Sequence, residues 1–447
     1  MKASSNLTFS PGFKRLLFVI AAFSGLIGIK RIVESFFPPE IYKKDFIQEY
    51  LMAKAILEGV NPYLPLPDLA GIWMSYADYN ELKHPTPHPP FVGLLGLPFG
   101  YLSYEKASIA WLIFELICLL AVILLMLRWW GKPVKAATIA IMYIIALGWI
   151  PIVDDLWFGQ LTICLLFLLV GAWLSLREEK NLLGGALLGG LIALKLMAWP
   201  IVIFLALRRK WSVVFSAGAV VVAANLLAAG VLGTNCVKYY YLEVGPLLAS
   251  IYRSHDVNYS SWTIGERFFA EFGKNFVAPP LFSSASLAWL FTYLIPAAVL
   301  LLGLRLALKV ENFDTAFGLL VGVAILVSPI AWTHYLILFS IPMMIIAQRL
   351  WRLGLPRRMS YLVFCLWLLI SIAGTAYSYI ARLFISHITP SGFPVVPSVA
   401  GLVTFIPAVA LSGLLWIVWR LDHVNTPKHD EVAVLTGEVE GRGLRYT

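Results

Sequence analysis

The sequence predicts an all-α, polytopic membrane protein with about 12 membrane segments. Hydrophobic residues make up 60% of its 447 residues, only 13% are charged, and the mean hydropathy is +0.81. Many apolar runs approach the 17 to 25 residues that a hydrocarbon core requires. This composition excludes an ordinary soluble protein of two or three domains. We expect one integral membrane domain over residues 1–420 and a polar, disordered cytoplasmic tail over residues 421–447.

The membrane segments are placed on the apolar runs. The first run is too long for a signal-peptide core and lacks a clear cleavage site, so we expect it to be retained. The segments lie near residues 14–37, 104–127, 136–153, 161–176, 182–194, 196–207, 211–232, 285–304, 313–330, 332–348, 360–382 and 397–419.

The loops between these segments alternate in charge. One set carries the basic clusters Lys14/Arg15, Arg128/Lys132/Lys135, Arg177/Lys180, Arg208–Lys210, Arg305/Lys309 and Arg349–Arg358, whereas the short loops 154–160 and 384–396 contain no Lys or Arg. Cytoplasmic loops are the basic ones, so both termini are expected in the cytoplasm. The formal charge of +9 therefore reports topology and does not indicate a nucleic-acid partner.

Residues 182–207 form one apolar run with basic clusters on both sides, so it cannot cross the membrane once. We expect a helical hairpin that enters and leaves from the cytoplasm, with its tip at Lys195–Pro200. Two large loops, near residues 38–89 and 233–284, then lie outside the cell. Any chemistry is expected on that extracytoplasmic side.

Asp45 opens a helical pattern in the first outer loop. Phe46 and Tyr50 follow with helical spacing, which predicts an amphipathic helix on the membrane surface. With Gln48 three residues later, Asp45 fits a capping box. The carboxylate also stands at the membrane edge, where a lipid-linked substrate presents its headgroup. A capping role and a chemical role are compatible.

Six motifs in order resemble glycosyltransferase family 87 of the GT-C superfamily. They are DFIQEYLMAKAILEGVNPY (45–63), HPPFVGLLGLPFG (88–100), FGQLTICLL (158–166), LLGGALLGGLIALKLMAWPIVIFLALRRKW (182–211), NYSSWTIGERFF (258–269) and SPIAWTHYLIL (328–338). The resemblance covers about residues 40–350. The sequence departs from the family pattern at His88, where Tyr is usual, and at Tyr259, where Gln is common.

The resemblance implies a GT-C type helical bundle in the bacterial cytoplasmic membrane. It also implies transfer of a sugar, with mannose the leading case, from a polyprenyl-phosphate donor to a glycolipid or glycan acceptor. Transfer would proceed with inversion, and the family's catalytic aspartate matches Asp45 as general base. The lipid-linked sugar is a substrate, and no cofactor or metal is expected. His84 and His88 stand four apart among prolines that preclude a helix, which argues against a zinc site.

Lys195 and His334 are the other main candidates, for binding the donor's phosphate or sugar. Lys195 interrupts an apolar hairpin, where a cation either snorkels to the interface or lines a cavity. His334 belongs either to an interfacial aromatic belt or to the substrate site, and the family's usual histidine at this motif favours the second reading.

Further residues are assigned by position. Gln160 is a candidate sugar contact, whereas the adjacent Asp154 and Asp155 are expected to serve the loop and the start of the next helix. Candidate acceptor or loop contacts are Tyr50, Tyr63, His88 and Asn258.

Two other function classes remain open. A transporter or flippase also has about a dozen spans, but its site usually lies at the bilayer midplane, often within inverted repeats that this sequence lacks. A noncatalytic scaffold would not require Asp45, Lys195 and His334 to converge, so their positions in space discriminate between the hypotheses.

Overall fold

The computed structural model describes residues 11–74, 83–132, 134–255, 257–270, 280–353, 357–372, 374–386 and 397–422. Every regular element within these ranges is a helix, as the sequence predicts. All but the first two residues of the expected tail, 421–447, lie outside the described residues.

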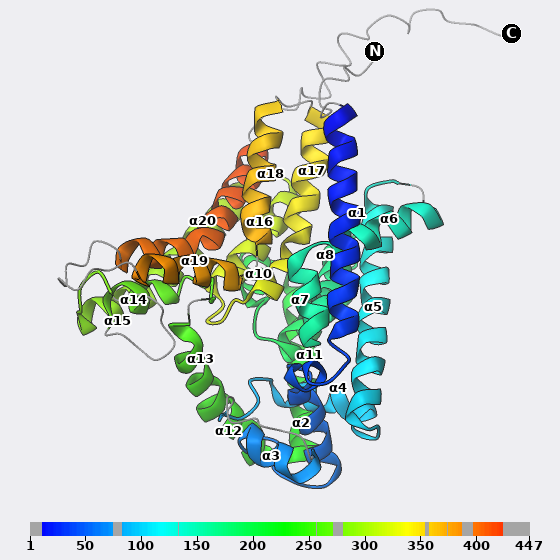
Figure 1. Ribbon diagram of the computed structural model, residues 1–447, viewed down its shortest axis with the longest axis vertical. Helices are drawn as coiled ribbons and strands as arrows, with labels where there is room; N and C mark the ends of the chain where they lie inside the picture. Colours follow the sequence, from blue (N-terminus) through cyan, green and yellow to red (C-terminus); the bar gives the residue numbers. More distant parts are fainter. Residues whose placement is uncertain are drawn as a thin grey trace, which may run out of the picture.

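The helices alternate between long membrane-sized elements and short ones (Figure 1). Their bounds are α1 Pro11–Glu34, α2 Ile47–Leu57, α3 Leu66–Trp73, α4 Pro90–Gly100, α5 Tyr104–Trp129, α6 Ala136–Leu147, α7 Ile150–Phe158, α8 Thr162–Arg177, α9 Asn181–Leu194, α10 Trp199–Leu207, α11 Trp211–Leu232, α12 Thr234–Tyr239, α13 Gly245–Arg253, α14 Thr263–Phe269, α15 Ala285–Lys309, α16 Phe313–Val327, α17 Ser340–Leu353, α18 Arg357–Ser371, α19 Gly374–Ser386 and α20 Pro397–Asp422. Short 3-10 segments lie at Glu40–Lys43 and Thr333–Phe339, and a π segment lies at Tyr240–Val244.

Several long apolar helices make this a multi-pass membrane protein. Within the described ranges, five helical units are long and apolar enough to cross a bilayer: α5, α11, α15, residues 333–350, and residues 402–421 of α20. Counting the bent pairs α6–α7 and α18–α19 as one span each raises the number to seven. The expected count of 12 is not reached, because α8, α9 and α16 have only 16, 14 and 15 residues.

The α6–α7 pair corrects one sequence expectation. The helix axis bends by 80° between the two elements, and α7 then continues to Phe158. Asp154 and Asp155 therefore lie within a helix and not in the expected loop at 154–160. Pro151 near the start of α7 explains the restart, because proline tolerates the first helical turn but interrupts a continuous one. Gly159, with φ of +69°, ends α7 in the left-handed conformation.

The turn-back expected over residues 182–207 is present. Helices α9 and α11 run parallel and very close, since a Cβ on Gly185 would lie 2.5 Å from the carbonyl oxygen of Val213 and one on Gly189 would lie 2.5 Å from that of Ala217. Because α9 and α11 point the same way, α10 returns the chain between them. The break between α9 and α10 at residues 195–198 is the tip of this hairpin.

Elements of the two large loops gather at one end of the molecule. Helices α2, α3 and α12 lie together at the bottom of Figure 1. Met52 and Tyr63 from the first loop pack with Tyr240, Val244 and Leu248 from the second. Parts of the two loops thus pack together at this end of the molecule, whereas α14 lies beside α15.

Helix α2 is not the one-sided surface helix that the sequence predicts. Every residue from Ile47 to Ala53 is buried, including Gln48 and Glu49. The reason is that α4 packs against it through glycines, so the face with the polar side chains is covered as well. Because α2 is enclosed, it holds the segment that precedes it, Asp45 and Phe46, in place.

Candidate functional site

One cavity of about 610 Å³ lies where several chain breaks meet. Its walls come from the segment before α2, the proline-rich residues 84–89, the α7–α8 turn, the α9–α10 break, α13, and residues 328–335 between α16 and α17. Helix ends leave backbone and polar side chains free of regular pairing. The cavity therefore presents several polar groups in a wall that is otherwise largely apolar.

Asp45 lines this cavity, and the residues on either side of it, Lys44 and Phe46, are held by hydrogen bonds. The buried Lys44 ammonium donates to Ser35 Oγ and to the carbonyl oxygen of Trp157, each at 2.7 Å. The Phe46 N–H donates to the carbonyl oxygen of Phe158 at 3.0 Å. Burial lowers the pKa of Lys44 to about 8. These contacts fix the backbone of Asp45 against the end of α7.

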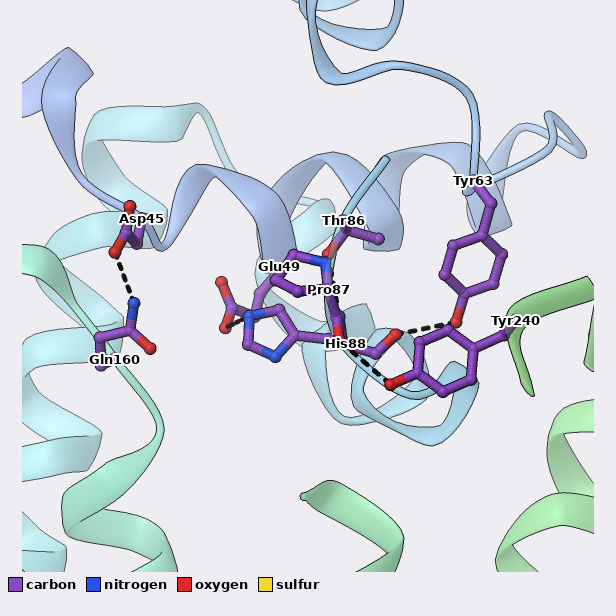
Figure 2. A network of polar contacts seen from close by, with 8 residues as sticks. All are labelled: Asp45, Glu49, Tyr63, Thr86, Pro87, His88, Gln160 and Tyr240. Carbon is purple, nitrogen blue, oxygen red and sulfur yellow. Dashed lines mark hydrogen bonds and ion pairs between the residues drawn. The ribbon is translucent and has the colours of Figure 1, made fainter. Parts of the chain in front are cut away.

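The capping box is absent. Helix α2 begins at Ile47, its cap position is Phe46, and no side chain caps it. The Asp45 carboxylate instead accepts a hydrogen bond from Gln160 Nε2 at 2.5 Å, with Oδ2 as the acceptor (Figure 2). Gln160 and Asp45 both line the cavity, and Oδ1 of Asp45 is left for another partner.

Burial raises the pKa of Asp45 from its usual 3.8 to about 6, and the hydrogen bond from Gln160 opposes the rise. A carboxyl group with a pKa near 6 is mostly ionised at neutral pH and is a stronger base than an ordinary aspartate. Such a shift is what general-base catalysis near neutral pH requires.

Lys195 brings a cation to the same cavity. It terminates α9, and its ammonium lies 4.0 Å from the centre of the Tyr335 ring. Its charge interacts with Asp45, Glu49 and Asp155, but in the described part of the chain no carboxylate lies within 4.0 Å of it. The ammonium is held by a cation–π contact with the Tyr335 ring, which leaves its N–H groups able to donate hydrogen bonds to a ligand.

His334 lies in the cavity wall beside Lys195. It belongs to the 3-10 segment that precedes α17, and its ring meets that of Tyr335 edge-on with centroids 4.5 Å apart. Its Nε2 is buried and has no hydrogen-bond partner among the described residues. Asp45, Gln160, Lys195 and His334, which the sequence assigns to one site, thus line one cavity.

Three of the expected contact residues do not line it. Tyr50 donates to the carbonyl oxygen of Leu102 at 3.0 Å, and Tyr63 donates to that of His88 at 2.9 Å. Asn258 is fully buried and bonds four backbone groups, including the Ala331 N–H at 2.9 Å. These side chains support the walls of the cavity.

The structure adds groups that sequence reasoning missed. Glu49, one helical turn after Asp45, meets Nε2 of His88 at 3.0 Å, and both side chains are buried. His84, also in the wall, bonds the hydroxyl of Tyr252 from α13. Glu49 lies in the first turn of α2, whose start follows Asp45 closely in the chain.

Asp154 and Asp155 have separate roles. Asp154 reaches the cavity wall and lies 3.7 Å from Arg31 at the end of α1. Asp155 is buried and accepts from the Ile163 N–H at 3.1 Å, which gives it the expected helix-start role at α8. Among the described residues, no group of three or more His, Cys, Asp or Glu side chains is arranged to hold a metal ion.

Comparison with known proteins identifies the family. The sequence profile of glycosyltransferase family 87 matches residues 87–329, which is more than half of the chain. Asp45 and His334 lie outside the matched range, so their roles rest on the cavity geometry. No curated protein and no solved structure matches the chain. The chain therefore belongs to glycosyltransferase family 87 and is a membrane glycosyltransferase.

Proposed function

We propose that this transferase moves a sugar, mannose in the leading case, from a polyprenyl-phosphate donor to a glycolipid or glycan acceptor. The transfer inverts the anomeric carbon. Asp45 is the general base that removes the proton from the attacking hydroxyl, and the polyprenyl phosphate departs. The reaction takes place on the extracytoplasmic face of the bacterial cytoplasmic membrane.

The observation that carries this proposal is the pairing of a raised-pKa carboxylate with an uncommitted ammonium in one cavity. Asp45 and Lys195 come from different segments and both line it. A displacement at a sugar phosphate needs a base for the nucleophile and positive charge for the leaving group. General-base catalysis contributes about 10²- to 10⁴-fold in rate, and the rest of the acceleration falls to positioning and charge stabilisation.

The remaining cavity groups can be assigned to the same two tasks, activating the acceptor hydroxyl and binding the donor. Gln160 orients the Asp45 carboxylate through Oδ2, which leaves Oδ1 for the acceptor hydroxyl. His334, with its unpartnered Nε2, stands beside Lys195 and serves the donor phosphate. An aromatic wall that includes Tyr252 and Trp332 suits the apolar faces of sugar rings.

The proposed topology follows from the basic loops. Both termini are cytoplasmic, and the cavity opens on the other side, where the two large loops lie. The twelve segments comprise full spans together with shorter helices such as α9 and α10, which enter and leave from the cytoplasm. The partners are the lipid-linked donor, the acceptor and the surrounding membrane lipids, and no nucleic acid.

The donor class is tested by offering the purified protein two sugar sources with total membrane lipid as acceptor. With polyprenyl-phosphate-mannose, mass spectrometry is expected to detect both free polyprenyl phosphate and a new glycosylated lipid. With GDP-mannose alone, neither should form. Transfer from the nucleotide sugar would refute the proposed donor, and no release of polyprenyl phosphate from any polyprenyl-linked sugar would refute the transferase mechanism.

A further inference from the structure

The pair formed by Glu49 and His88 has no part in the mechanism described so far, although His88 lines the cavity. Glu49 Oε1 and His88 Nε2 are 3.0 Å apart, and less than a twentieth of either side chain is exposed (Figure 2). A buried charge without a partner is costly, so the pair is a fixed feature of the fold. The two atoms lie within ion-pair distance, although their geometry is not that of a hydrogen bond.

The backbone of His88 is held as firmly as its ring. The hydroxyl of Tyr63 donates to the His88 carbonyl oxygen at 2.9 Å, and the hydroxyl of Tyr240 donates to that of Pro87 at 3.1 Å (Figure 2). Pro87 and Pro89 flank the histidine and restrict its backbone further. Three contacts and two prolines therefore orient one imidazole ring before any ligand binds.

This orientation leaves the second ring nitrogen available. Nε2 is engaged with Glu49, and His88 lines the cavity, so Nδ1 is the ring nitrogen left to meet a ligand. A neutral ring accepts a hydrogen bond at Nδ1, and a charged ring donates one. A sugar hydroxyl can both donate and accept, so it suits Nδ1 in either protonation state.

The place of the His88 ring in the cavity favours the donor's sugar as the group that it contacts. His88 lines the same cavity as Asp45 and His334. Under the proposed function, Asp45 holds the attacking hydroxyl, whereas His334 and Lys195 hold the phosphate. In an inverting displacement the sugar lies between the attacking and leaving groups. The sugar ring would then lie within the cavity that His88 lines.

We propose that His88, oriented by Glu49, binds a hydroxyl group of the transferred sugar and so contributes to sugar recognition. Glu49 acts through His88 and is a positioning residue. This inference rests on the proposed function, and it is tested by binding in the absence of acceptor, so that no transfer is needed.

Two substitutions separate the two ring nitrogens. In His88→Gln, the amide nitrogen can take the place of Nε2 and keep the contact with Glu49, but nothing replaces Nδ1. In His88→Asn, the shorter amide lies nearer the position of Nδ1, and the contact with Glu49 is lost. A purely structural histidine would tolerate Gln better than Asn in every respect.

The dissociation constants of wild type and variants are measured in detergent for polyprenyl-phosphate-mannose and for polyprenyl phosphate without a sugar. His88→Gln should weaken binding of the sugar-bearing lipid about three- to tenfold, the value of one hydrogen bond, and leave binding of the bare lipid within about twofold. His88→Asn should bind the sugar-bearing lipid better than His88→Gln while melting at a lower temperature. Glu49→Ala should weaken sugar-lipid binding as His88→Gln does, and Glu49→Gln, which keeps an acceptor oxygen, should restore it.

Unchanged binding of the sugar-bearing lipid by His88→Gln would overturn the inference, and so would an equal loss for both lipids. Either result would leave the proposed function standing, provided that wild type binds the donor. Failure of wild type to bind either lipid would overturn the proposed function and this inference together. Glu58→Gln, near the exposed end of α2 and outside the cavity lining, is the matched control for the Glu49 variants.

Discussion

Replacing Asp45 by asparagine is expected to stabilise the folded protein at neutral pH. Burial raises the pKa of Asp45 from 3.8 to about 6, which means that the folded state holds the proton more tightly than the unfolded chain. A shift of this size corresponds to about 3 kcal/mol of unfolding free energy. Asparagine keeps an oxygen that can accept from Gln160 Nε2 and has no charge to bury. The variant should therefore avoid the cost of an ionised carboxylate.

The difference in stability between Asp45→Asn and wild type is expected to depend on pH. The stability that the protonated carboxyl retains is fully present below pH 3.8 and is lost as pH rises through about 6. Thermal unfolding of Asp45→Asn and wild type in the same detergent should thus give similar melting temperatures at about pH 4, and a variant more stable by several degrees at about pH 8. If the variant is less stable than wild type by the same amount at both pH values, burial does not strain the carboxylate and the reasoning fails.

Three further predictions follow from the same contacts. Since Asp45 must be ionised to act as a base, kcat/KM should fall about tenfold per pH unit below pH about 6. A kcat/KM that does not change between about pH 5 and pH 8 would exclude Asp45 as the base. Lys44→Met, which leaves Ser35 Oγ and the Trp157 carbonyl oxygen without their donor, should lower the unfolding free energy by about 1–3 kcal/mol. Lys43→Met, at an exposed ion pair, should change it by less than about 1 kcal/mol. Equal melting temperatures of the two variants would contradict this. Gly189→Ala would place a Cβ 2.5 Å from the backbone of α11 and should lower the unfolding free energy by about 1–3 kcal/mol. Gly190→Ala, whose Cβ would lie 4.0 Å from its nearest neighbour, should be tolerated. Equal effects of the two variants on the melting temperature would disprove the close α9–α11 contact.

The membrane class and the helical composition were predictable because apolar composition and run length determine them directly. The number of spans was not. A run such as residues 161–176 is apolar enough for a span, but its helix has 16 residues and is too short to cross alone. Hydropathy measures what a segment would bury, and it does not distinguish burial in lipid from burial among other helices.

The chemistry-bearing residues of the cavity were accessible to sequence reasoning where an ionisable group interrupts an apolar run. Lys195 is such a residue, and the structure brings it into the cavity with Asp45. The motif order supplied Gln160 and His334. For Tyr50, Tyr63 and Asn258 the same approach identified the correct loops, but the direction of each side chain depends on tertiary packing.

The Glu49–His88 pair illustrates what sequence patterns leave out. The two residues are 39 positions apart, and Glu49 lies in a segment for which the sequence predicts a helix on the membrane surface. Its burial comes from α4 covering α2, a contact between two helices whose glycines permit close approach. Asp154 and Asp155 were likewise assigned to the loop after the apolar segment 136–153, whereas α7 continues to Phe158 and Gly159 ends it.

The most direct test of the central claim is the release of polyprenyl phosphate from polyprenyl-phosphate-mannose by wild type, Asp45→Asn and Asp68→Asn, with total membrane lipid as acceptor. Asp68 is an exposed carboxylate on α3, outside the cavity lining, and its variant serves as the control. The account predicts that Asp68→Asn retains the wild-type rate, whereas Asp45→Asn loses about 10²- to 10⁴-fold while remaining folded and still binding the donor. Turnover by folded Asp45→Asn at the wild-type rate would contradict the assignment of Asp45 as the general base.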